Sequence, residues 1–70
     1  MVPLAMANAG EQGVIRKITG KDEVRQHMAE LGFVVGEKLT VVSVLGGNMI
    51  ISIKGSRVAI DKTMAVRIMI

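Results

Sequence analysis

The chain contains no cysteine, tryptophan or tyrosine, and it has one phenylalanine, one proline and one histidine among its 70 residues. Without cysteine it can form no disulfide framework and no thiolate metal site, and a small domain without such links is typical of a reducing compartment. Residues 1–7 lack the positive flank and long apolar stretch of a signal peptide, and no apolar run approaches the ~18 residues that span a bilayer. We therefore expect a cytoplasmic protein without a targeting or membrane segment.

The single histidine limits the chemistry that the chain can perform. Catalysis needs a placed nucleophile, base or metal, and the serines and threonines have only His27 to activate any of them. A metal ion held by protein needs several ligands in one place, and only Glu23 and Glu30 stand at helical spacing from His27. We expect no enzyme activity and no cofactor, with His27 as a weak candidate for transition-metal binding that a solvated helix flank explains equally well.

The scarcity of aromatic residues argues against two kinds of binding. Grooves for proline-rich peptides are lined with aromatic side chains, and single-stranded nucleic acid is usually held by base stacking. The charge is nevertheless basic, at +3 overall, and 37–70 carries five basic and two acidic residues where 1–36 carries four of each. The second half of the chain therefore suits an acidic partner, although charge alone does not choose among nucleic acid, an anionic membrane surface and an acidic protein.

The residues that are abundant indicate short strands around an aliphatic core. Half of the chain is apolar, which is ordinary for a folded protein, and 70 residues predict one domain covering 1–70. Glycines divide the sequence into β-branched runs of strand length. The expected strands are 14–18, 39–45, 49–53, 57–60 and 66–70.

One segment changes from strand-like runs to a helical period. Val24, His27, Met28 and Leu31 stand at i, i+3, i+4 and i+7, which is one stripe of a helix. This spacing predicts a helix over 22–31. Thr19 or Asp22 is expected to cap its first turn, and Gly32 to end it.

A single helical turn capped by Asp61 is expected at 61–65, between the last two strands. Five short, strongly twisted strands cannot leave a flat apolar face exposed, so the economical arrangement is a small closed barrel with the helix over one open end. We therefore predict a mainly β protein, an SH3-like small five-stranded barrel capped by one short α-helix.

Glycine and aliphatic positions recur in a series of short segments: PL at 3–4, GEQGV at 10–14, ITG at 18–20, MAELGFVVG at 28–36, GG at 46–47, GSRVAI at 55–60 and AVRI at 65–68. In order and spacing this series resembles the ferrous iron transport protein A family, the FeoA-like domains, over essentially the whole chain. Two positions depart from it. Val35 stands where proline commonly precedes the glycine, and the hairpin loop at 46–48 is shorter than usual.

The resemblance implies a small cytosolic accessory or regulatory protein of bacterial ferrous iron uptake. Its partner would be the FeoB-type membrane permease, which carries a GTPase domain, and it would reach the membrane only through that partner. The alternatives are a basic nucleic-acid-binding barrel, which the missing aromatics disfavour, and a stand-alone relative of the SH3-like domain of metal-dependent repressors. The sequence leaves the oligomeric state and the direction of the effect on the permease open.

Two segments are candidates for partner binding. Phe33, Val34 and Val35 follow the predicted helix, where an exposed apolar patch would mark a contact surface, although Phe33 is equally suited to fill the core. Lys54 and Arg57 flank the Gly55 turn and could present positive charge to an acidic partner, or serve only as solubilising turn residues.

Overall fold

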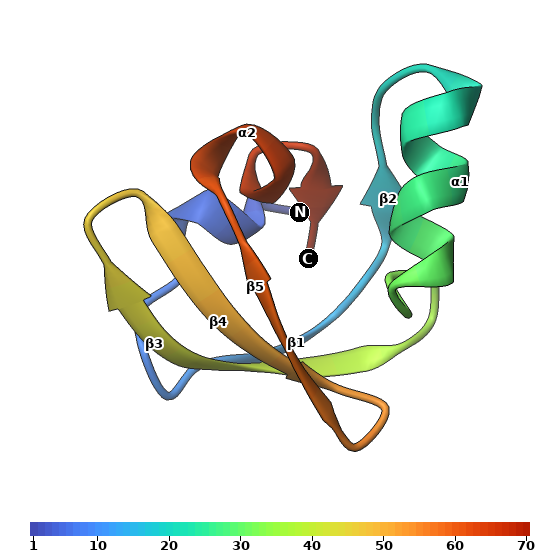
Figure 1. The fold of residues 1–70 in the computed structure, drawn as a ribbon. Helices are drawn as coiled ribbons and strands as arrows, with labels where there is room; N and C mark the ends of the chain where they lie inside the picture. Colours follow the sequence, from blue (N-terminus) through green and yellow to red (C-terminus); the bar gives the residue numbers. More distant parts are fainter.

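In the computed structural model, which describes residues 1–70, a four-stranded antiparallel sheet forms the centre of the fold (Figure 1). Its strands, in spatial order, are β1 (Gln12–Val14), β3 (Lys38–Leu45), β4 (Asn48–Ile53) and β5 (Ser56–Ile60). A second sheet pairs β2 (Lys17–Ile18) with β6 (Ile68–Met69). The fold thus has six short strands where the sequence predicted five.

The hairpins form where the sequence predicted them, because strand alternation and turn chemistry agree. Along β3 and β4 the inward-facing side chains are Leu39, Val41, Met49, Ile51 and Ile53. The β3–β4 turn passes through Gly46 at φ +61°. The β4–β5 turn has two left-handed residues in succession, Lys54 at φ +51° and Gly55 at φ +75°, which is the twist that matches a two-residue hairpin.

The strand predicted at 14–18 is divided in two, which corrects that prediction. The Ile15 N–H donates to Glu37 O at 2.9 Å and its carbonyl accepts from Gly36 N at 2.8 Å, while the next N–H, that of Arg16, donates to Met69 O at 2.8 Å. The chain therefore leaves the first sheet at Ile15 and joins the second at Arg16. Arg16 and Lys17 point to solvent as expected, and Ile15 is buried.

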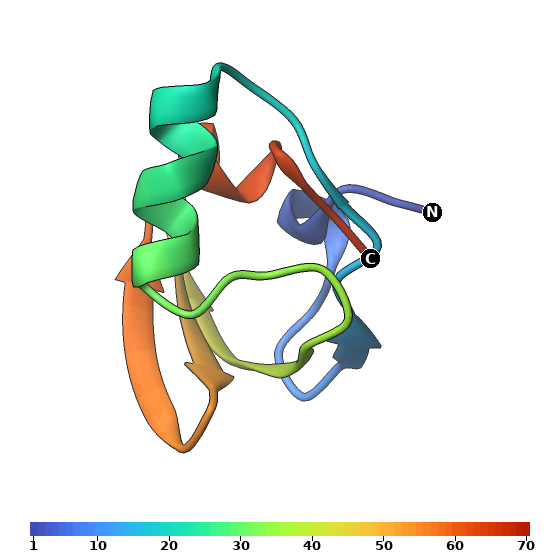
Figure 2. The same ribbon diagram turned by 90° about the vertical axis from the view of Figure 1, so that its right-hand side faces the viewer.

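The predicted helix is present as α1 (Asp22–Glu30). Met28 is buried, Val24 and Leu31 are half-buried, and the chain leaves the helix through Gly32 at φ +102°. His27, which the spacing placed on the same stripe, is exposed. Figure 2 shows α1 standing over one end of the sheet, with the following segment returning to β3.

Neither predicted cap residue of α1 caps it. The N-cap is Lys21, which makes no side-chain cap bond. Thr19 Oγ1 instead donates to Arg67 O at 3.4 Å, and Asp22 Oδ1 accepts from Arg25 Nη1 at 3.3 Å. Because Thr19 bonds a distant segment and Asp22 bonds a side chain of its own turn, neither side chain accepts from the free N–H groups at the start of α1.

The expected helical turn is α2 (Lys62–Ala65), and its predicted cap is confirmed, because Asp61 Oδ1 accepts from Met64 N at 2.9 Å. The strand predicted at 66–70 is shorter than expected. Val66 and Arg67 finish the helical turn through bonds to Lys62 O and Met64 O, each 3.0 Å long, and only β6 pairs with a neighbouring strand.

The core contains 13 buried residues, all of them apolar, and part of it comes from a segment that the sequence left without structure. Leu4–Met6 forms the short 3₁₀ helix η1, and Leu4 and Ala7 are buried. Two backbone bonds of 2.8 and 2.9 Å join Val2 to Ile70, so the first residues cover the barrel beside β6. The full list is Leu4, Ala7, Ile15, Met28, Phe33, Leu39, Val41, Met49, Ile51, Ile53, Ile60, Ala65 and Ile68.

Candidate partner-binding surface

The segment after α1 divides its three candidate residues between the core and the surface. Phe33 is fully buried, and its N–H donates to Met28 O at 2.9 Å. This corrects its assignment as a contact residue, because the only aromatic ring of the chain fills the core beneath the helix end. Val34 is half-buried, whereas Val35 is 64% exposed. Of the apolar patch predicted at 33–35, Val35 is therefore the residue that a partner can reach.

Lys54 brings the β4–β5 turn against this segment. Its ammonium lies 3.8 Å from Glu37 Oε1, and its side chain packs over Gly32, where an added Cβ would fall 3.7 Å from Lys54 Cδ. An exposed pair of this kind contributes little to stability. It does place Lys54 beside the 32–37 segment, so that two candidates 19 positions apart in the chain, Val35 and Lys54, belong to neighbouring segments.

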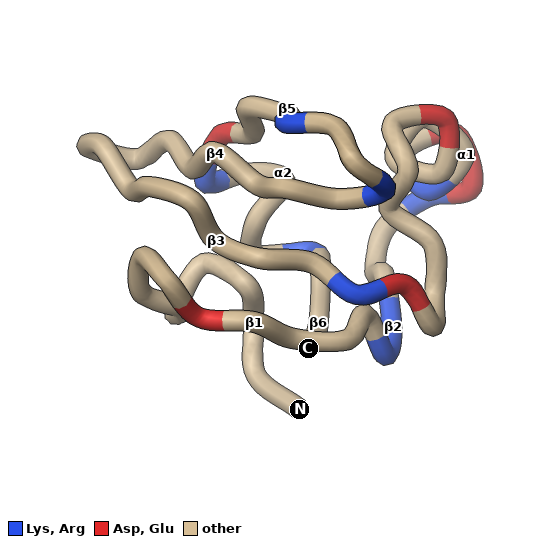
Figure 3. Tube along the Cα trace, turned by 90° about the horizontal axis from the view of Figure 1, so that it is seen from below, with Lys and Arg blue, Asp and Glu red and all other residues tan.

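Arg57 lies one strand further, on the outward face of β5. Cross-strand pairing aligns it in one row with Ser52, Thr40 and Gln12. It is exposed and forms no ion pair, since the two ion pairs of the structure are Lys54–Glu37 and Arg25–Asp22. Figure 3 shows basic positions on β5, at the β4–β5 turn and at the start of β3. The candidate surface is therefore predominantly basic.

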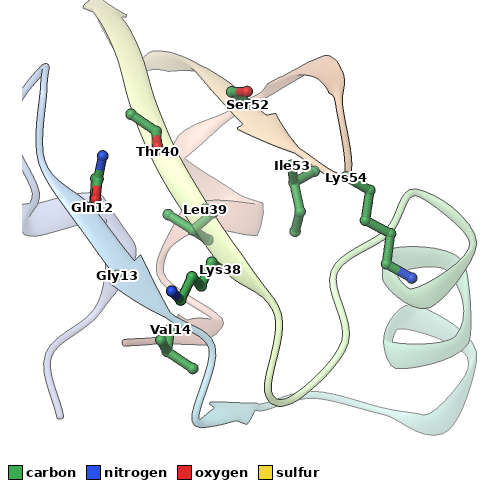
Figure 4. A pocket seen from close by; sticks show the side chains of 9 residues that line it. All are labelled: Gln12, Gly13, Val14, Lys38, Leu39, Thr40, Ser52, Ile53 and Lys54. Carbon is green, nitrogen blue, oxygen red and sulfur yellow. The ribbon is translucent and has the colours of Figure 1, made fainter.

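A trough of about 450 Å³ crosses β1, β3 and the end of β4 on this side (Figure 4). The trough runs between two rows of outward-facing side chains, because alternate side chains along a strand point to opposite faces. One of these rows consists of Gln12, Thr40 and Ser52. Lys38 and Lys54 provide its charged groups. Its nine lining residues are Gln12, Gly13, Val14, Lys38, Leu39, Thr40, Ser52, Ile53 and Lys54.

The weak metal candidate, His27, has no cluster of further ligands around it within the chain. His27 is exposed on α1, and the structure contains no group of three or more His, Cys, Asp or Glu side chains that could hold a metal ion. The helical spacing of Glu23 and Glu30 therefore does not bring them together with His27 as ligands.

Sequence reasoning missed a second exposed apolar surface, at the β3–β4 hairpin. Leu45 is 73% exposed and Val44 44% exposed. Val44 also lines a hollow of about 190 Å³, together with Ala5 and Lys62. The signal was present in the sequence, because Val44 and Leu45 are consecutive apolar residues and successive strand positions face opposite sides. Figure 1 places this hairpin at the far end of the barrel from α1.

The fold places the chain among small SH3-like domains, mainly β with a short helix, as the sequence predicted. The FeoA domain family model matches residues 2–70, and the chain belongs to that family. A protein of Methanocaldococcus jannaschii provisionally named Fe(2+) transport protein A is 39% identical over 70 residues, which is 100% of this chain and 85% of that protein. The resemblance inferred from the sequence is therefore confirmed.

Solved structures agree with this assignment. The crystal structure of an iron uptake regulatory protein (FeoA) is 34% identical, with a TM-score of 0.88 over 96% of this chain and 89% of that one. Stenotrophomonas maltophilia FeoA, solved with zinc and described as an SH3 domain protein, is 23% identical, with a TM-score of 0.83 over 99% and 88%. A manganese-dependent transcriptional repressor shares the fold at 19% identity, with a TM-score of 0.86 over 94% of this chain and 38% of its own.

Proposed function

We propose that this chain is an accessory protein of ferrous iron uptake that binds the cytosolic side of a FeoB-type permease and changes its transport or GTP turnover. The observation that carries the proposal is membership of the FeoA family over residues 2–70. The Stenotrophomonas maltophilia relative, described as a candidate activating factor of bacterial ferrous iron transport, supports the same role.

The architecture supports binding rather than catalysis as the contribution of this chain. The single histidine is exposed on α1, and the polar side chains that line the trough include no acid or base besides two lysines. Exposed apolar side chains rimmed by polar or charged groups are typical of contact surfaces. Val35 is exposed next to the Lys54–Glu37 pair, and the unpaired Arg57 follows on β5, so this side of the barrel combines both features, and we place the permease contact there. The structure contains no helix that is long and apolar enough to cross a membrane.

The test is recovery of the permease on the tagged chain from detergent-solubilised membranes of its own host, with identification by mass spectrometry. Val35→Asp introduces a charge at the proposed contact. Leu45→Asp makes the same change at a comparably exposed apolar residue at the other end of the barrel, and serves as the matched control. We expect the wild type and Leu45→Asp to recover the permease, and Val35→Asp to lose it.

The converse result, with Leu45→Asp losing the permease and Val35→Asp retaining it, would move the contact to the β3–β4 hairpin. Recovery of nucleic acid without any membrane protein would contradict the permease role and favour the nucleic-acid alternative. In a second arm, the purified permease is assayed for GTP hydrolysis with and without the wild-type chain, and an unchanged rate together with unchanged iron transport would contradict an accessory role.

A further inference from the structure

β5 is an open edge of the four-stranded sheet. Its only extensive contact with another element is with β4, and the strand order ends with it. The sheet's other edge, β1, has three residues, and the Ile70 side chain packs over its central residue, Gly13. β5 has five residues, contains no proline and pairs with β4 without a register shift. It therefore lacks the bulge, proline or cover that usually protects an edge strand.

The pairing register shows which backbone groups of β5 are free. The two-residue turn joins Ile53 to Ser56, and the residues that close such a turn exchange both backbone hydrogen bonds. Because bonding alternates along an antiparallel strand, Val58 and Ile60 also direct their N–H and C=O groups to β4. Arg57 and Ala59 direct theirs away from the sheet, and neither takes part in any backbone bond outside the strand ladders. A complementary strand could use both residues.

The charges around this edge favour one kind of strand. Arg57 on the edge, Lys62 just beyond its end and Lys38 on the outer face of the sheet form no ion pairs. Of the carboxylates in the adjoining turns, Glu37 faces Lys54, and Asp61 keeps its charge while it accepts from Met64 N, so the unpaired cations remain in excess. An added strand would place one side chain directly opposite Arg57, with Cβ atoms roughly 5 Å apart. A carboxylate at that position would find an unpaired cation.

We propose that the β5 edge binds an extended, acidic segment of a partner protein, which adds to the sheet as a fifth strand. Backbone bonds at Arg57 and Ala59 would hold the segment. Acidic side chains would face Arg57, and alternate apolar ones would lie beside the half-buried Val58. Within the proposed function, this names the kind of permease segment that the surface recognises, and it rests on that function only for the identity of the partner.

The test uses the purified full chain and two short fluorescent peptides, one with alternating glutamate and valine and one with lysine in place of glutamate. Fluorescence anisotropy is expected to show binding of the glutamate peptide only, and nuclear magnetic resonance to show its strongest effects on the amides of Arg57 and Ala59. Arg57→Glu should weaken binding roughly tenfold, because an attraction becomes a repulsion. Arg16→Glu, at an exposed arginine outside this sheet, should leave the affinity unchanged.

A backbone variant separates strand addition from simple charge attraction. Ala59→Pro removes a free N–H at an edge position where proline is tolerated, whereas Ala59→Thr keeps it. Binding should be lost in the proline variant and retained in the threonine variant. If the proline variant fails to fold, as judged by its amide spectrum, the Arg57→Glu comparison decides the question.

Three results would overturn the proposal. They are equal binding of the two peptides, unchanged binding by Ala59→Pro, and a wild-type dimer that Ala59→Pro converts to a monomer, which would show that a second copy covers β5. Because no permease is present, failure here with successful permease recovery would reject strand addition and leave the proposed function standing. Peptide binding without permease recovery would reject the proposed function and leave strand addition at β5 standing.

Discussion

The side chain of Ile70 lies directly on Gly13, and a Cβ atom added to Gly13 would fall 3.0 Å from Ile70 Cδ1 and 3.2 Å from Ile70 Cβ. Gly13 is the central residue of β1, and Ile70 follows β6, so this contact joins the two sheets. The absence of a side chain at Gly13, and not its backbone freedom, is what the barrel uses here. The second glycine of the GEQGV segment, Gly13, therefore has a packing role that depends on the tertiary structure.

We predict that Gly13→Ala lowers the free energy of unfolding by about 1–3 kcal/mol, because overpacking forces neighbouring groups to shift. Urea denaturation would measure the change. Combining it with Ile70→Ala should cost less than the sum of the two single changes, since the smaller side chain makes room for the new methyl group. Gly47→Ala, whose Cβ would meet only Lys62 Cβ at 3.9 Å, is the control. Strict additivity of the first pair would show that Ile70 is not the obstacle.

We predict a ranking of core truncations below α1. Phe33→Ala should lower the free energy of unfolding by about 3–5 kcal/mol, because the ring is fully buried. Leu31→Ala should cost less than that change, because Leu31 is half-buried at the end of α1. Thermal unfolding followed by circular dichroism compares the two. A larger loss for Leu31→Ala would mean that Phe33 is not the main support of the helix end.

The cap of α2 gives a prediction with a matched carboxylate. Asp61→Ala should destabilise the protein by about 0.5–2 kcal/mol, because it leaves the Met64 N–H without its partner. Asp22→Ala removes an aspartate whose only side-chain bond is an exposed one to Arg25, and it should change stability by less than about 0.5 kcal/mol. Equal effects of the two substitutions in denaturant titrations would contradict the capping role.

The β4–β5 turn offers a stabilising substitution. Lys54 is the only non-glycine residue with positive φ, and asparagine followed by glycine is the pair that this turn type favours. We expect Lys54→Asn to raise the midpoint of thermal unfolding by a few degrees, because relief of backbone strain outweighs loss of a surface ion pair. Glu37→Gln, which removes the same pair without altering the turn, should leave the midpoint nearly unchanged. A lower midpoint for Lys54→Asn would show that the Glu37 contact matters more than the strain.

Local signals accounted for the elements that local interactions build. The stripe ending at Gly32 predicted α1, the glycines of the two turns predicted both hairpins, and Asp61 was correctly identified as a cap. The division of the first strand at Ile15 could not be predicted, because it depends on bonds to Glu37 and Met69 from distant parts of the chain. Burial of Leu4 had no local signal either, since a three-residue 3₁₀ helix leaves no period to detect.

The candidate surface was likewise predictable from the sequence only in part. Its residue types were identified from glycine turns and the position after the helix, but the burial of Phe33, the exposure of Val35 and the pairing of Lys54 with Glu37 required the tertiary structure. By itself, the sequence determined the class of fold, the family, the helix and the hairpins, because propensity, period and turn chemistry act over a few neighbouring residues. Only the tertiary structure decided which side chains fill the barrel, where the first strand changes sheets and which strand edge stays open. Those features depend on contacts between residues far apart in the chain, and side-chain type does not specify which residues will meet.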